Sequence, residues 1–220
     1  MAPLMLDLFC GTKSVSRVFA AHGWETFTLD IDPSCHADLT CDILDLKREQ
    51  LPSPESVFFI WASPPCTEYS RARTRALKPR NLELADRLVA KTFEVISWFD
   101  GVPFCVENPA TGMLPGRAVV QGKPFSVISY CKYTAPGDGF PPYKKDTAVW
   151  HNLQWNPRPP CRLGKRCEHF VDGGHPAHVV RWYKLAKGEV KARRGFSLDQ
   201  LHAIPPALIE EIVEAAVGGL

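Results

Sequence analysis

The sequence lacks the features that mark membrane or secreted proteins. It has no apolar run near the ~18 residues that a membrane-spanning helix needs, and its first residues show no basic segment followed by an apolar one. Its formal net charge is only +2, so total charge points to no particular partner. We therefore expect no membrane partner and an intracellular, reducing location, which is the cytoplasm or, in a eukaryote, the nucleus.

The cysteines form no disulfide framework. All eight are scattered along the chain, and several lie within apolar runs. In a chain of this size, that pattern favours reduced thiols that bind metal or take part in catalysis. With 220 residues, of which 45% are hydrophobic and 23% charged, the chain is typical of one globular domain.

Short apolar runs alternate with helical patterns over the first half of the sequence. We expect strands at 3–9, 24–29, 57–62 and 102–106, a short third strand that precedes or includes 41–43, an early helix ended by Gly23, and a long helix over 82–99. Strands at 125–131 and 147–151 and a helix over 206–217 follow. This alternation predicts an α/β fold with a mostly parallel sheet and right-handed crossovers.

Ser63-Pro64-Pro65-Cys66 follows the apolar run at 57–62, so a cysteine stands in a stiff loop at the carboxyl end of a buried strand. Open α/β sheets present their ligands at that edge. Two interpretations of Cys66 stand at this point: a small apolar residue beside a turn, or a positioned nucleophile. Basic residues at 71, 73, 75, 78 and 80 follow with no acid among them. They indicate either a solvated face or a cationic loop that touches phosphates.

Three earlier strand ends carry residues that suit a nucleotide-like cofactor. Phe9-Cys10-Gly11 begins a turn into a helix, where backbone amides can approach a ligand. Asp30 lies at the tip of the second strand, where an acid accepts hydrogen bonds from ribose hydroxyls. Asp42 and Ile43 could accept from an adenine amino group and pack against its ring. An isolated Asp at a strand end is more often a cap or a turn former, but three such ends in order favour a cofactor site.

These residues resemble the motifs of the cytosine C5-methyltransferases. Asp7-Leu8-Phe9-Cys10-Gly11 is similar to the family's first motif, Asp30 to its ribose-binding acid, and Asp42-Ile43 to its adenine-contacting pair. Pro65-Cys66 resembles the catalytic Pro-Cys, and Glu107-Asn108-Pro109 resembles the Glu-Asn-Val motif. The order and approximate spacing agree from residue 4 to about residue 110, which is half of the chain.

The resemblance implies a Rossmann-like methyltransferase fold, with helices on both faces of the sheet, that uses S-adenosylmethionine to methylate C5 of cytosine in DNA. The base would be flipped out or single-stranded. Cys66 would add to C6 of the base while Glu107 assists at N3. The implied cofactor-binding residues are Asp7, Phe9, Gly11, Asp30, Ile31, Asp42, Ile43, Ser63 and Pro64. The implied substrate-binding residues are Pro65, Ser70, Arg71, Arg73, Arg75, Asn108, Lys144 and Lys145.

The second half of the chain leaves little room for the family's large target-recognition region. We expect a single methyltransferase domain over 1–220, with the cofactor and catalytic core in 1–110 and a short recognition element in 153–195. In that element, the side chains of Cys161, Cys167, His169 and His175 could hold a structural zinc ion. Exposed histidines and incidental cysteines are the alternative.

Two other functions stay open at this stage. The same chemistry could act on RNA or use a modified methyl donor. The chain could also be a catalytically silent nucleic-acid-binding module that keeps only the fold. The presence of both Cys66 and Glu107 argues against the silent module.

Overall fold

The computed structural model of the chain describes residues 2–71, 73, 78–134, 140, 143–162, 167, 169, 175, 182–184, 190–192 and 198–218. Its centre is a seven-stranded sheet with the order β3-β2-β1-β4-β5-β7-β6. The strands are β1 (Leu4–Leu8), β2 (Glu25–Asp30), β3 (Leu39–Thr40), β4 (Val57–Ala62), β5 (Phe104–Pro109), β6 (Phe125–Ser129) and β7 (Asp146–His151). The helices are α1 (Ser16–Ala21), α2 (Leu82–Ser97), α3 (Leu198–His202) and α4 (Pro206–Val217). Two further strands, β8 (Trp182–Lys184) and β9 (Val190–Ala192), pair only with each other.

The sheet is mostly parallel, as predicted. β1 pairs in parallel with β2 and β4, and the parallel pairing continues from β2 to β3 and from β4 to β5. β7 lies between β5 and β6 and runs antiparallel to both. The strand order reverses between β1 and β4, and the crevice outside such a reversal is where open α/β sheets bind ligands.

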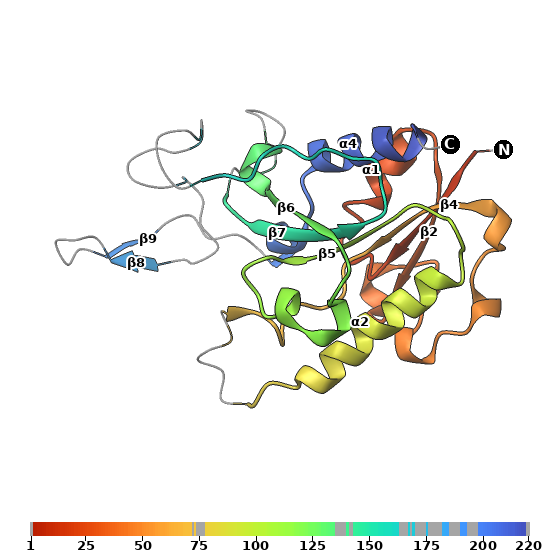
Figure 1. The fold of residues 1–220 in the computed structure, drawn as a ribbon, viewed down its shortest axis with the longest axis horizontal. Helices are drawn as coiled ribbons and strands as arrows, with labels where there is room; N and C mark the ends of the chain where they lie inside the picture. Colours follow the sequence, from red (N-terminus) through yellow and green to blue (C-terminus); the bar gives the residue numbers. More distant parts are fainter. Residues whose placement is uncertain are drawn as a thin grey trace.

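Helices cover both faces of the sheet, which confirms the predicted layers (Figure 1). Successive side chains of a strand point to opposite faces. Accordingly, Met5 packs in one core cluster with residues of α1 and α4, whereas Leu6 and Leu8 pack in a second cluster with residues of α2. Among the described helices, none has both the length and the apolar character needed to cross a membrane.

The strand predicted over 102–106 extends further along the chain than its apolar run. β5 continues through Glu107 and Asn108 to Pro109, because Glu107 pairs with Val149 and Asn108 with Ala148 of β7. The antiparallel neighbour therefore holds these two polar residues at fixed positions of the sheet. By contrast, the predicted long helix begins where expected, since the side chain of Asn81 caps α2 by accepting a hydrogen bond from the amide of Leu84 at 3.0 Å.

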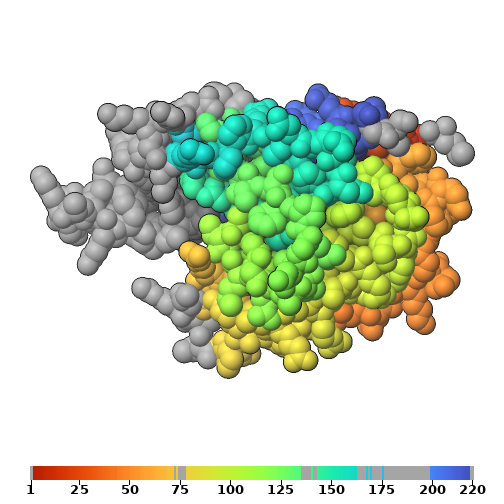
Figure 2. All heavy atoms as spheres, in the orientation of Figure 1, coloured from red at the N-terminus to blue at the C-terminus, as the bar shows by residue number. Residues whose placement is uncertain are grey.

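The segment between β5 and β6 packs against the loop that follows β4. The amide of Met113 donates to the carbonyl oxygen of Tyr69 at 3.0 Å. A Cβ atom added at Gly112 would lie 3.2 Å from the carbonyl oxygen of Pro109 and 3.3 Å from that of Tyr69. In the space-filling view, residues 110–125 (green) also lie against α2 (yellow) along this face (Figure 2). Gly112 thus allows two backbone segments to approach closely.

We expect Gly112→Ala to lower the free energy of unfolding by about 1–3 kcal/mol, because the atoms that a methyl group would meet belong to the backbone and cannot rotate away. Gly116→Ala is the matched control. No atom lies within 4 Å of a Cβ there, so its effect should stay within about 0.5 kcal/mol. Urea unfolding of both variants measures the difference, and equal losses would contradict this packing.

Candidate active site

Cys66 and Glu107 lie at neighbouring strand ends. Ala62, the last residue of β4, pairs with Val106 of β5. Glu107 therefore lies beside the start of the loop that leads to Cys66. The side-chain Nδ2 of Asn108 donates to the carbonyl oxygen of Pro64 at 2.9 Å, and Asn108 is only 1% exposed. This buried bond ties the loop that carries Cys66 to the strand that carries Glu107. Asn108 therefore positions the loop, and its contact with substrate stays a prediction.

Glu107 is itself held by two partners. Its Oε1 accepts a hydrogen bond from the hydroxyl of Tyr130 at 3.1 Å and lies 3.5 Å from Nζ of Lys145. The Lys145 ammonium also lies 4.7 Å from the centre of the Tyr130 ring. Lys145 is thus placed in the site, whereas Lys144, predicted beside it, forms a 2.5 Å ion pair with Asp146.

The charges around Cys66 act on its thiol in opposite directions. Burial raises the pKa of the Cys66 thiol above its ordinary value, and the carboxylate of Glu107 raises it further, while Lys145 lowers it. The thiolate is the nucleophilic form of cysteine. Removing the charge of Glu107 would therefore favour the reactive form of Cys66.

Two arginines of the predicted cationic loop after Cys66 bind to groups of the loop itself. Arg73 pairs with Glu68 of the same loop and donates to the carbonyl oxygen of Pro79 at 3.1 Å. Arg80 donates to the carbonyl oxygen of Ser70 at 2.8 Å. These guanidinium groups satisfy the carbonyls and the acid of their own loop, which a run of charges in the sequence does not reveal.

Four further residues near Cys66 were predicted to bind substrate. Pro65 and Arg71 are exposed, and Ser70 is partly buried. Arg75 lies outside the described residues. Exposure leaves Pro65 and Arg71 accessible to a ligand, and their assignment stays a prediction.

A side-chain network anchors the far end of the Cys66 loop. The buried Tyr69 donates through its hydroxyl to Oδ1 of Asp86 on α2 at 2.8 Å. Nε of Arg117 lies 3.1 Å from both oxygens of the same carboxylate. The hydrogen bonds from Arg117 are the largest cause of the lowered pKa of Asp86. Nothing in the sequence marks Asp86 or Arg117, because a charged residue is ordinary until its partner is known.

The edge formed by β1, β2 and β3 carries the predicted cofactor residues. Both oxygens of Asp30 accept backbone hydrogen bonds at 2.9 Å, one from Gly11 and the other from Asp32. The turn after β1 has three residues with positive φ: Phe9 at 61°, Gly11 at 47° and Lys13 at 57°. Such angles are uncommon for residues other than glycine. The turn therefore keeps an unusual shape although only one of the three is glycine.

Beside Asp30, the side chain of Ile31 is 61% exposed. A carboxylate suits ribose hydroxyls, and an exposed apolar side chain suits the face of a purine ring. Asp30, Ile31 and the adjacent backbone turn thus provide polar and apolar groups of the kind that a nucleoside requires, and their role in binding the cofactor stays a prediction.

Several predicted cofactor residues also have contacts within the protein. Ile43 is only 2% exposed and belongs to the core on the α2 face, so little of its side chain is accessible to a ring, and its ring-packing role stays a prediction. Asp42 caps the turn that follows it by accepting from the amide of Leu44 at 2.9 Å. Ser63 accepts a hydrogen bond from the indole of Trp61 at 2.8 Å, and Pro64 is buried. Within the predicted set, apolar surface is therefore offered by Ile31, which is exposed, and by Phe9, which is partly buried.

Asp7, the first residue of the predicted motif, is buried and forms a hydrogen bond to the backbone that follows the turn. It is 2% exposed and accepts a hydrogen bond from the amide of Ser16 at 3.2 Å. Burial raises the pKa of its carboxyl group to about 7, although the hydrogen bonds from Ser16 oppose this shift. Its buried position differs from the direct cofactor contact that we predicted.

Of the predicted metal ligands, Cys161, Cys167 and His175 come together and His169 does not. Nε2 of His169 lies 3.2 Å from the carbonyl oxygen of Thr134. Cys131 takes the fourth position in the cluster. Its place at the end of an apolar run is typical of a core residue, so the sequence gives no sign of a ligand there.

The opposing effects of Glu107 and Lys145 predict how the reactivity of Cys66 responds to pH. Alkylation requires the thiolate, so its midpoint should lie above the ordinary thiol pKa of about 8.5. We expect Lys145→Gln to move the midpoint to higher pH and Glu107→Gln to move it to lower pH. Peptide mass spectrometry after iodoacetamide pulses measures the rates. Cys41 in the same samples is the internal control, and shifts in the reverse order would contradict the assignment.

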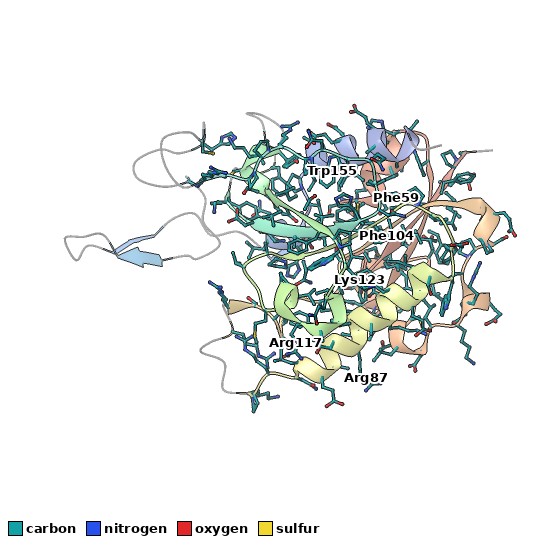
Figure 3. The ribbon with its side chains drawn as sticks, viewed as in Figure 1. Phe59, Arg87, Phe104, Arg117, Lys123 and Trp155 are labelled. Atoms are coloured by element: carbon teal, nitrogen blue, oxygen red, sulfur yellow. The ribbon has the colours of Figure 1, made fainter. Side chains whose placement is uncertain are left out.

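The network at Tyr69 predicts a specific loss of stability. We expect Asp86→Ala to lower the free energy of unfolding by about 1–3 kcal/mol, because Tyr69 and Arg117 lose their acceptor. Arg87→Ala changes the next residue, which is exposed (Figure 3), and should cost less than about 0.5 kcal/mol.

The contribution of Asp86 to stability should also depend on pH. Since the folded-state pKa of Asp86 is lowered, this contribution is present above the unfolded-state pKa and shrinks as pH falls through the folded-state pKa. Thermal unfolding at several pH values tests both statements, and an Asp86→Ala loss independent of pH would argue against the ionic part of the network.

Comparisons with known proteins agree with this geometry. No protein-family model matches the chain. A probable DNA (cytosine-5)-methyltransferase of Frog virus 3 (isolate Goorha) is 28% identical over 224 residues, which cover 96% of this chain and 98% of the relative. The Entamoeba histolytica methyltransferase EhMeth superposes with a TM-score of 0.57 at 8% identity and covers 100% of this chain and 99% of its own.

The Schizosaccharomyces pombe Dnmt2 methyltransferase matches with a TM-score of 0.43 at 12% identity, over 76% of this chain, which spans 57% of that protein. The similarity to the viral relative runs through nearly the whole chain, including both strand ends that carry Cys66 and Glu107. The similarity to EhMeth supports the fold. The chain is similar over nearly its whole length to a probable DNA (cytosine-5)-methyltransferase, and it has a Rossmann-like fold like that of the methyltransferase EhMeth.

Proposed function

We propose that the chain transfers a methyl group from S-adenosylmethionine to C5 of cytosine in DNA through a covalent adduct at Cys66. The observation that carries this proposal is the placement of Cys66 and Glu107 at adjoining strand ends, joined by the buried bond from Asn108 to Pro64. The name of the Frog virus 3 relative favours DNA as the polymer. The target base would enter flipped out or single-stranded, because its reacting atoms are unreachable inside a duplex.

The first step makes C5 of cytosine nucleophilic. The Cys66 thiolate adds to C6, so that a bond forms between Sγ and C6 while the electrons of the C5–C6 double bond move into the ring. Glu107, which takes up a proton from solvent as the base binds, meets the charge that develops at N3 by donating that proton there. Its Oε1 already contacts Tyr130 and Lys145, so we assign Oε2 to the base.

Substrate binding and thiol activation are coupled through charge. In the free protein, the carboxylate of Glu107 raises the pKa of Cys66. When Glu107 shares a proton with N3 of the base, this negative charge is reduced and the thiolate becomes more favourable. Lys145 supports the thiolate throughout. The nucleophile is thus favoured when a base is in place.

The cofactor would be held by Asp30, Ile31 and the turn after β1. When bound, S-adenosylmethionine supplies an electrophilic methyl group on a sulfonium sulfur. C5 of the adduct would take up that methyl group, and S-adenosylhomocysteine would leave. The C5 proton would then pass to solvent and the N3 proton would return to Glu107, and cleavage of the bond between Cys66 and C6 would restore the pyrimidine ring and the free thiolate.

A DNA oligonucleotide that contains 5-fluorocytosine tests this mechanism. Because fluorine cannot leave C5 as a proton does, the adduct should persist after methyl transfer and appear as a stable protein–DNA complex by mass spectrometry. We expect no complex with Cys66→Ser, and adduct formation slower by about 10²–10⁴-fold with Glu107→Gln, which lacks the acid. Complex formation should also require S-adenosylmethionine.

Cys41→Ser is the matched control, since it removes another partly exposed thiol that lies at the cofactor edge. It should trap DNA as the unchanged protein does. A complex that survives in Cys66→Ser would refute Cys66 as the nucleophile. Trapping with an RNA oligonucleotide but not with DNA would assign the enzyme to RNA, and no trapping with either would favour the silent binding module.

A further inference from the structure

Four buried side chains converge outside the active site. Cys131, Cys161, Cys167 and His175 each offer one ligand atom, and these atoms all lie within 4.8 Å of one another. Cys131 belongs to the short 3-10 helix η8 (Tyr130–Lys132) that follows β6, whereas the other three come from a later part of the chain. Among the described residues, this is a group of four that could surround one ion.

The separations match the edges of a tetrahedron around zinc. Zinc binds sulfur at about 2.3 Å and imidazole nitrogen at about 2.0–2.1 Å, so tetrahedral ligands lie about 3.6–3.8 Å apart. Sγ of Cys131 and Sγ of Cys167 are 4.0 Å apart. Nε2 of His175 lies 3.6 Å from Sγ of Cys161 and 3.3 Å from Sγ of Cys167. All three sulfurs are free thiols, and 4.0 Å is far beyond the ~2.05 Å of a disulfide.

The ligand set selects the kind of metal and its role. Three thiolates and one imidazole are soft or borderline ligands, which suit zinc and not magnesium or calcium. Four protein ligands also complete a tetrahedral shell and leave no position for water or substrate, as in structural zinc sites. The burial of all four residues agrees with a closed site.

The core of the protein holds two of the ligands in place. The amide of Cys161 donates to Oγ of Ser129 at 2.9 Å, and this hydroxyl donates to Oδ1 of Asp146 on β7 at 2.6 Å. Cys131 follows directly after Tyr130, which binds Glu107. The cluster is therefore built onto the ends of β6 and β7, beside the residues that support the active site.

We propose that Cys131, Cys161, Cys167 and His175 bind one structural zinc ion that fastens Cys161, Cys167 and His175 to η8. Among the described residues, the three sulfurs form a cluster of their own, separate from the two main cores. The metal would therefore add a contact between η8 and the other three ligands that the main cores do not supply. The proposal does not depend on the reaction catalysed at Cys66.

The full chain, purified without chelators, should contain about one zinc ion per molecule by inductively coupled plasma mass spectrometry. We expect Cys131→Ser to lose the bound zinc. His169→Ala is the matched control: it removes the histidine that the spacing suggested but that lies against Thr134, and it should keep about one zinc ion. Absence of zinc from the unchanged protein, or its loss from His169→Ala with retention in Cys131→Ser, would overturn the proposal.

A measurement on the unchanged protein covers the case in which Cys131→Ser does not fold. X-ray absorption at the zinc edge should fit three sulfur neighbours at about 2.3 Å and one nitrogen at about 2.0 Å. A shell of two sulfurs and two nitrogens would show that Cys131 is not a ligand. Addition of a strong chelator should also lower the melting temperature, because the metal binds only the folded chain.

Discussion

The hydrogen bond from Asn108 to the carbonyl oxygen of Pro64 joins the two strand ends on which the chemistry depends. Asn108 and Pro64 are both buried, so neither the amide group nor the carbonyl oxygen could bond to water in place of this partner. The two prolines before Cys66 stiffen the same loop, and Tyr69 fastens its other end to Asp86 on α2. Cys66 is therefore held from both sides, and the short loop can present a thiol without a large surrounding domain.

The reversal of strand order between β1 and β4 brings two groups of candidate site residues to one edge of the sheet. The turn after β1 and the tip of β2 provide the polar and apolar groups that suit a nucleoside, while β4 and β5 provide the thiol and the carboxyl group. Because all these strands are parallel, their carboxyl ends open on the same side. The antiparallel β7 adds Lys145, which immediately precedes it, and so brings a positive charge to the two acidic groups.

Local sequence patterns were sufficient to predict most of the strands and helices in the first half of the chain. The run at 57–62 and the helical spacing from Leu82 depend on neighbouring residues, and both elements formed where expected. Contacts between distant residues could not be predicted in this way. The insertion of β7 between β5 and β6, the pairing of Arg73 with Glu68, and the approach of Cys131 to Cys161 all depend on the folded arrangement. Ile43 and Ile31 show the same limit, since only the packed core decides which isoleucine remains exposed.

Asp7 makes the turn above it sensitive to protons. With a pKa near 7, its buried carboxyl group is divided between its neutral and charged forms at neutral pH. A positive charge brought to this turn favours the charged form, so the binding of a sulfonium compound there would release a proton from Asp7. The affinity of this turn for such a cation would then increase as pH rises through the pKa of Asp7. The acid at the start of the first motif would thus act as a counter-charge to a cation at the turn.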